Sequence, residues 1–373
     1  MQMESNAAIG AGEPTVLHPG PKLVAALLHS RAMFPNSALW LLQESRMLAS
    51  RGRLEEAIDL MDTAERSEMK QVDALLIFDK AMVLVFLHKY ERAAKELLFL
   101  VELNAWSHSL YTFFAGVCYA ESYRMCKMGL TIEGGVDNVD PSKMDWYKQR
   151  AEECITEAPT LVGKKKFLSK PMPFERFVLR KYDNLMKTKE ETGLDLIDCI
   201  NCSIAHELAY FWNGYNRMPE EHLKLSIKLL GYSASPDCKY ATLNPETGKS
   251  YSKIKETREE SFLRYTLTSI SLRRLGLIDE GMKMIDDKVI KYLFEHNKID
   301  SSNRFNKLTE NPWVYPTSCY ERSLFTWKSQ GVDGLDEAKV WLKRALVIGG
   351  DDYELSTRVG MKIKAALDRL EGL

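Results

Sequence analysis

Cys199, Cys202 and His206 are the residues whose types and spacing best fit a chemical site. On one continuous helix, intervals of three and four residues place all three side chains on the same face, where they could bind a metal ion. A structural zinc site needs four ligands, and Cys238 would have to supply the fourth from a loop. Because buried structural cysteines are common, we favour a structural role for these residues over a role in a metal- or thiol-dependent enzyme.

Other catalytic patterns begin in the sequence without being completed. His206-Glu207 starts like the HExxH helix of a zinc protease, but Tyr210 stands where the second histidine is required. Gly248-Lys249-Ser250 resembles the end of a phosphate-binding loop, yet Leu243 replaces its first glycine and no strand is expected before it. The sequence therefore predicts a protein without catalytic residues, metal ligands or a cofactor.

A short basic region and two aromatic clusters are the candidates for partner binding. Arg176 and Arg180 share a helical face, which suggests an acidic peptide or a lipid headgroup as ligand, although neighbouring Glu175 and Asp183 also fit an ordinary solvated face. The aromatic clusters, residues 210–215 and 312–316, suit either partner binding or the packing of adjacent helices. The candidate partner-binding residues are Lys165, Arg176, Arg180, Lys181, Trp212, Tyr215, Trp313 and Tyr320.

The composition narrows the classes of protein that the chain can belong to. A net charge of −1 over 373 residues gives no bulk attraction to nucleic acid or to a membrane surface. Seven cysteines without a secretory signal indicate reduced thiols, and residues 81–87, the longest apolar run, are too few to span a bilayer. We expect an intracellular protein of the cytoplasm or also of the nucleus, with protein partners, no nucleic acid and no transmembrane segment.

A repeated helical hairpin must position these residues. Leu54-Glu-Glu-Ala57 is followed 36 residues later by Tyr90-Glu-Arg-Ala93, close to the roughly 34-residue period of tetratricopeptide repeats. We predict an all-α, tetratricopeptide-like solenoid over residues 21–373, after a flexible leader (1–20), with irregular insertions such as 129–140 and 231–252. The expected hairpins lie near 37–66, 72–103, 106–157, 195–230, 257–293 and 316–347, with a capping helix at 353–370.

Several blocks of the sequence resemble one family in order as well as in residues. Ser37–Ile58, Pro173–Lys181, Tyr210–Met218 and Asn311–Trp313 are similar to the tetratricopeptide-repeat protein 39 family, and more closely to the fungal inclusion body clearance proteins. The resemblance runs from about Pro21 to the C-terminus. Because family members usually have a further helical region before this block, we expect the chain to be the C-terminal part of such a protein.

The resemblance implies a non-catalytic adaptor in the clearance of misfolded-protein inclusions, with links to lipid droplets. Partners would be misfolded or lipid-droplet-associated proteins, and some members are placed at the mitochondrial outer membrane. The family brings no catalytic residues. An alternative function is a peripheral lipid- or sterol-binding protein of lipid metabolism.

Overall fold

The structure is a computed structural model that describes residues 20–65, 69–103, 107–132, 135, 137–163, 166–167, 170–292, 310–349 and 353–372. The polypeptide divides into two compact units, which we describe separately. The first unit ends at His222, and the second unit begins at Leu223. The single continuous solenoid expected over residues 21–373 stays a prediction.

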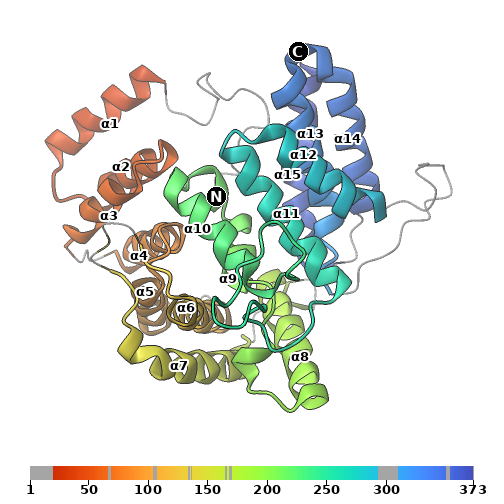
Figure 1. Ribbon diagram of the computed structural model, residues 1–373. Helices are drawn as coiled ribbons and strands as arrows, with labels where there is room; N and C mark the ends of the chain where they lie inside the picture. Colours follow the sequence, from red (N-terminus) through yellow and green to blue (C-terminus); the bar gives the residue numbers. More distant parts are fainter. Residues whose placement is uncertain are drawn as a thin grey trace. The chain divides into compact units, whose positions relative to one another are not determined.

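The first unit, coloured from red to green in Figure 1, begins with successive helical hairpins. In the described residues of this unit, helices α2 to α7 pair as predicted: α2 with α3, α4 with α5, and α6 with α7. Two further helices, α8 and α9, follow a small antiparallel pair of two-residue strands. The elements are α1 (Pro21–Met33), α2 (Ala38–Ser50), α3 (Leu54–Asp62), α4 (Lys70–Phe86), α5 (Tyr90–Leu103), α6 (His108–Met128), α7 (Met144–Glu157), β1 (Lys166–Phe167), β2 (Lys170–Pro171), α8 (Pro173–Thr192) and α9 (Ile204–Phe211).

Small residues allow the paired helices of the first unit to approach closely. Ala57, Ala81 and Ala93 are fully buried at the helix contacts where the repeat pattern predicts them. A Cβ atom added at Gly116 would lie 2.8 Å from Ile155 Cγ1, so α6 can meet α7 only with glycine at this position. The loop predicted at 129–140 begins as expected, because Gly129 ends α6 in the left-handed conformation with φ of 63°.

The second unit repeats the same hairpin architecture. Helix α10 (Glu220–Leu230) continues into it from the first unit, and α11 pairs with α12, and α13 with α14, while α15 packs on α14. A Cβ atom at Gly281 would lie 2.8 Å from the Phe325 ring, which explains glycine where the earlier repeats have alanine. The bounds are α11 (Arg258–Arg274), α12 (Ile278–Lys288), α13 (Val314–Gln330), α14 (Leu335–Gly349) and α15 (Ser356–Glu371).

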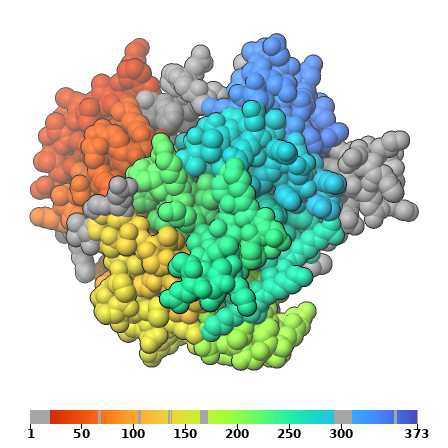
Figure 2. Space-filling view, in the orientation of Figure 1, coloured from red at the N-terminus to blue at the C-terminus, as the bar shows by residue number. Residues whose placement is uncertain are grey.

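Short 3-10 helices and one long loop complete the fold. The 3-10 helices are η1 (Pro141–Lys143), η2 (Ala158–Leu161), η3 (Leu196–Cys199), η4 (Gly214–Asn216), η5 (Gly231–Ser233), η6 (Ile290–Tyr292) and η8 (Gly331–Gly334). The loop predicted at 231–252 contains η5 and an isolated bridge between Leu243 and Ser250. Its green-to-teal atoms lie on the face of the molecule shown in Figure 2. The all-α class predicted from the sequence is confirmed.

The predicted hairpin at 195–230 needs one correction. Cys199, Cys202 and His206 do not lie on one continuous helix, because the structure has η3, a break over 200–203, and then α9. Helix α9 starts at Ile204 because the Ser203 hydroxyl accepts a hydrogen bond from the His206 backbone N–H at 3.2 Å, which is an N-cap. Cys199 and Cys202 therefore precede the helix that carries His206.

Candidate functional site

Helices α8 and α9 meet through a cluster of aromatic rings, here called the α8–α9 aromatic cluster: Phe174, Phe177, Phe211 and Trp212. Pro173 suits the first position of α8, because its fixed φ matches a helix and its missing N–H would have had no partner there. Phe174 stacks on Trp212 with ring centroids 4.6 Å apart, and Phe177 meets Phe211 edge-to-face at 6.1 Å. Trp212 is only half-buried, so one part of the cluster reaches the surface.

The basic residues predicted to bind a partner do not share one environment. Arg176 and Arg180 are half-buried on α8, and Arg180 lies over the Phe177 ring at 5.4 Å. Lys181 is buried and forms an ion pair with Glu207 of α9, with its Nζ 2.6 Å from the carboxylate. Its prediction as a surface contact is corrected, since this charge joins two helices. Lys165 lies outside the described residues.

Three of the four predicted aromatic contact residues lie in the interior. The Tyr215 hydroxyl lies 2.9 Å from His206 Nδ1, and the side chain is 2 % exposed. In the second unit, Trp313 and Tyr320 are each 1 % exposed. These three side chains therefore present no surface to a partner in this structure, which corrects their assignment. Partner binding by Trp212, Arg176 and Arg180 stays a prediction.

The cysteines and the histidine of the predicted metal set are separated by the break before α9. Cys199 ends η3, Cys202 lies in the break, and His206 is on α9, so they do not share one helical face. Burial raises the pKa of the Cys199 thiol, and it lowers the pKa of His206 to about 3. Among the described residues, no three or more histidine, cysteine or acidic side chains are placed to hold a metal ion.

A buried polar network, which sequence reasoning missed, lies in the first unit between α6, α9 and the turn that joins α4 to α5. Arg124 donates to the carbonyl oxygens of Ile200 and Asn201, the second at 2.9 Å, and its guanidinium lies 3.3 Å from Glu121. Both side chains are 1 % exposed. The two bonds to carbonyl oxygens fix the backbone of the break before α9. Burial raises the pKa of the Glu121 carboxyl. The network therefore connects buried polar groups of α6 to the chain segment before α9.

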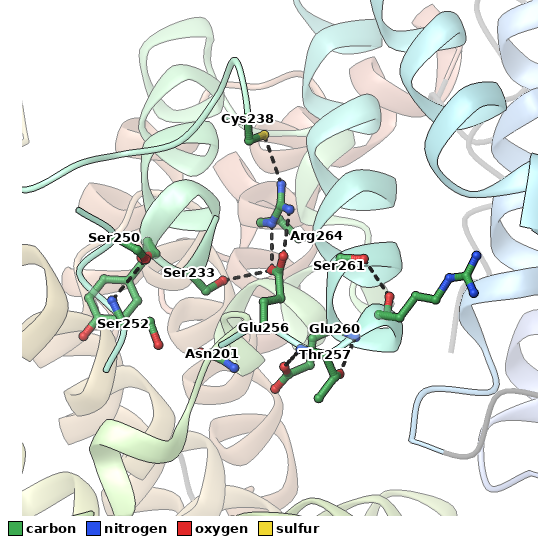
Figure 3. Close-up of polar contacts among 12 residues, drawn as sticks. Asn201, Ser233, Cys238, Ser250, Ser252, Glu256, Thr257, Glu260, Ser261 and Arg264 are labelled. Carbon is green, nitrogen blue, oxygen red and sulfur yellow. Dashed lines mark hydrogen bonds and ion pairs between the residues drawn. The ribbon is translucent and has the colours of Figure 1, made fainter. Parts of the chain in front are cut away.

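The second unit has its own buried ion pair, which fixes the loop before α11. The Arg264 guanidinium donates to both oxygens of Glu256, at 2.7 and 2.8 Å, and the Ser233 hydroxyl donates to the same carboxylate at 3.1 Å. Figure 3 shows the carboxylate between Arg264 and Ser233, with the Cys238 thiol on the other side of the guanidinium. This two-point pairing of arginine with a carboxylate anchors residues 233–256 to α11.

None of the helices in the described ranges is both long enough and apolar enough to cross a lipid bilayer.

The comparisons with known proteins give one consistent result. Residues 7–275 match the family model described as Iml2/Tetratricopeptide repeat protein 39. An IML2-like protein of Saccharomyces cerevisiae is 48% identical over 363 residues, which are 96% of this chain and 46% of the relative. The inclusion body clearance protein IML2 of Kluyveromyces lactis is 47% identical over 363 residues, covering 96% of this chain and 47% of the relative. The protein of the same name from Candida glabrata is 46% identical over 361 residues, with shares of 95% and 45%. The chain thus spans about half the length of these relatives. No solved structure matches it.

Proposed function

The chain belongs to the Iml2/tetratricopeptide repeat protein 39 family, and from this membership we propose that it is a non-catalytic adaptor in the clearance of misfolded-protein inclusions. The names of the relatives carry this proposal, because those from Kluyveromyces lactis and Candida glabrata are called inclusion body clearance proteins. A body of stacked helical hairpins suits this role, since repeat proteins offer extended surfaces to other proteins.

The environment of the ionisable core residues supports an adaptor over an enzyme. Glu121 and Arg124, and likewise Lys181 and Glu207, form ion pairs between buried side chains. A general acid or a nucleophile must reach a substrate, and these groups contact other parts of the fold instead. Their roles are therefore structural in this proposal.

We place the binding face on α8, beside the exposed part of Trp212. Arg176 and Arg180 are one helical turn apart, so their guanidinium groups can contact one acidic segment of a partner. The half-buried indole adds apolar contact area next to these charges. Lys165, which lies outside the described residues, belongs to the same proposal by its charge alone.

The cellular role is tested in Saccharomyces cerevisiae lacking its own inclusion body clearance protein IML2. The chain is expressed there with a fluorescent misfolding reporter, and the lifetime of the inclusions is measured after the reporter is switched off. We expect the protein to shorten that lifetime. Inclusion lifetimes equal to those of the empty-vector strain, at matched protein levels, would contradict the proposal.

The binding face is tested with Arg176→Glu/Arg180→Glu in the same strain. We expect this variant to fold, as judged by circular dichroism, and to clear inclusions more slowly. The matched control, Lys283→Glu/Lys343→Glu, makes the same charge change at exposed positions of α12 and α14. Equal clearance by the two variants would exclude the α8 face while leaving the adaptor role intact.

The place of action is also a proposal. The resemblance favours the cytoplasm and the nucleus, with contact at lipid droplets or the mitochondrial outer membrane through bound proteins. Fractionation and droplet flotation of the cells used above measure this distribution. Flotation of the purified chain with protein-free lipid vesicles would instead favour direct lipid binding.

A further inference from the structure

His88 occupies a backbone conformation that glycine takes in the comparable turns. The turns after α2 and α11 place Gly52 and Gly276 in the left-handed region, with φ of 75° and 80°. The α4–α5 turn has the same hydrogen bonds, from His88 N–H to Val85 O at 3.0 Å and from Lys89 N–H to Leu84 O at 2.9 Å. In this turn, however, the left-handed residue is a histidine, with φ of 58°. A side chain with a Cβ is disfavoured in this conformation, so the imidazole must serve another purpose.

The imidazole of His88 belongs to a row of three buried rings. His88 Nδ1 lies 3.0 Å from Nδ1 of His222 on α10, and the two rings stack with centroids 5.2 Å apart. The ring of His206 lies 5.4 Å from His88 on the other side. His206 is in turn bonded to the hydroxyl groups of Tyr90, at 3.2 Å, and Tyr215, at 2.9 Å. The row joins the α4–α5 turn to α9 and to the start of α10, all in the first unit.

The charged groups that face this row come from α3, α6, α10 and the α4–α5 turn. His222 has Glu55, Glu221 and Lys89 as charged neighbours, and the Lys89 Nζ lies 2.8 Å from Glu55. His206 has Arg124, whose guanidinium is paired with Glu121, and the charged neighbours of His88 are the other two histidines. Burial lowers the pKa of all three imidazoles, so they are neutral at pH 7.

Water reaches one end of the row. His222 lines a cavity of about 140 Å³ together with Arg53, Glu55 and Glu221, among other residues of the α2–α3 turn and the start of α10. His88 and His206 are 0 % and 1 % exposed, so a proton from solvent meets His222 first. The row therefore has two enclosed imidazoles, His88 and His206, and one imidazole, His222, that borders a cavity.

We propose that His88, His206 and His222 form an acid-sensitive lock that holds α9 and the start of α10 against the α4–α5 turn. While the imidazoles are neutral, one Nδ1–H donates to the other Nδ1 and the rings stack. When both rings of the facing pair are protonated, two N–H donors meet 3.0 Å apart and the hydrogen bond is lost. Protonation of His88 or His206 would also place a positive charge in the interior, because these side chains are 0 % and 1 % exposed.

The direction of the pH effect follows from proton binding. An unfolded histidine takes up its proton near pH 6.5, whereas burial lowers the pKa of all three folded imidazoles below that value. The full stability is therefore present above about pH 6.5 and is lost as the pH falls, until the folded groups also titrate. An imidazole that stays neutral in the folded chain while its unfolded counterpart is protonated lowers the folding equilibrium constant by up to about tenfold per pH unit.

Hydrogen exchange of the whole chain between pH 7.5 and 5.0, with EDTA present to exclude metal binding, tests the lock. We expect amides of α9 and the start of α10 to lose protection as the pH falls, earlier than those of α13 in the second unit. His222→Asn keeps an N–H donor near the position of Nδ1 but cannot take up a proton. In this variant, the loss of protection with falling pH should be smaller by up to about tenfold per pH unit. His29→Asn, on the exposed face of α1, is the matched control and should change nothing.

His88→Gly provides a second variant in case His222→Asn does not fold. Glycine suits the left-handed turn, so this variant should fold at pH 7.5 and show a weaker pH dependence. The proposal is overturned if α9 loses protection with falling pH as steeply in these variants as in the parent chain. It is also overturned if α9 and α13 lose protection together in the parent.

Discussion

Lys181, which the sequence suggested as a partner-binding residue, instead forms a buried ion pair with Glu207. Their ion pair spans 2.6 Å between α8 and α9, and the Glu207 side chain is fully buried. Lys181 Nζ also lies 5.5 Å from the centroid of the Phe177 ring, so the charge has two contacts within the fold. Arg176 and Arg180, on the same helix, are only half-buried. A charge-reversal experiment on the α8 face must therefore leave Lys181 unchanged.

We predict that Lys181→Met destabilises the chain by about 3–5 kcal/mol, because it leaves the Glu207 carboxylate buried without its cation. Lys181→Met/Glu207→Gln should recover a large part of this loss, since neither residue then carries a charge. Urea unfolding followed by circular dichroism measures both free energies. A Lys181→Met variant as stable as the parent would show that the pair contributes little, and would reopen a surface role for Lys181.

At the scale of elements, the hairpins could be predicted from the sequence and the break before α9 could not. Apolar and small residues recur at helical spacing in residues 37–66 and 72–103, and such local patterns determine where a helix can bury a face. The spacing of Ile197, Ile200 and Ile204 continues this pattern without a visible interruption. The chain is nevertheless broken there, because Arg124, some 76 residues earlier, binds the Ile200 and Asn201 carbonyls. Ser203, a residue type favoured at an N-cap, is a local sign of where α9 starts, whereas the distant Arg124 contact leaves no sign in this stretch.

The buried histidine row was missed for a related reason, although one of its residues did carry a signal. His88 stands in a turn where the analogous positions hold Gly52 and Gly276, and a histidine at a glycine position is unusual. His222 gives no such sign, because it lies within a regular helix. Its position opposite His88, 134 residues earlier in the chain, depends on how α10 packs.

The start of α11 permits a prediction at the element scale. Thr257 and Glu260 form a capping box: the Thr257 hydroxyl accepts from the Glu260 N–H at 3.2 Å, and the Glu260 carboxylate accepts from the Thr257 N–H at 2.7 Å. Thr257→Ala should lower the free energy of unfolding by about 1 kcal/mol, since two backbone donors of the first turn lose or weaken their bonds.

Ser261→Ala, one turn into α11, is the control for this prediction. Its hydroxyl bonds only to the Arg258 carbonyl within the helix, so its loss should change the stability by less than about 0.5 kcal/mol. Chemical denaturation of both variants decides the matter. Equal effects of the two substitutions would mean that the cap does not contribute to stability.

At the scale of the whole molecule, each unit contains its own close helix contact at a glycine and its own buried ion pairs. Glu121–Arg124 and Lys181–Glu207 lie in the first unit, whereas Arg264–Glu256 and Arg273–Glu321 lie in the second. Each unit therefore has close-packed and buried polar contacts of its own. This arrangement bears on whether the chain unfolds as one body, as a continuous solenoid would, or in two steps.

We predict that an overpacking substitution weakens only the unit that contains it. Gly116→Val forces a side chain against Ile155 and Gly281→Val forces one against Phe325, each where a Cβ would already lie 2.8 Å from its neighbour. Each should cost about 1–3 kcal/mol. Hydrogen exchange should then rise in α4–α7 for the first variant and in α11–α14 for the second. If Gly281→Val raised exchange equally in α4–α7, the two units would form one cooperative body, because nearest-neighbour contacts transmit such a loss along a solenoid.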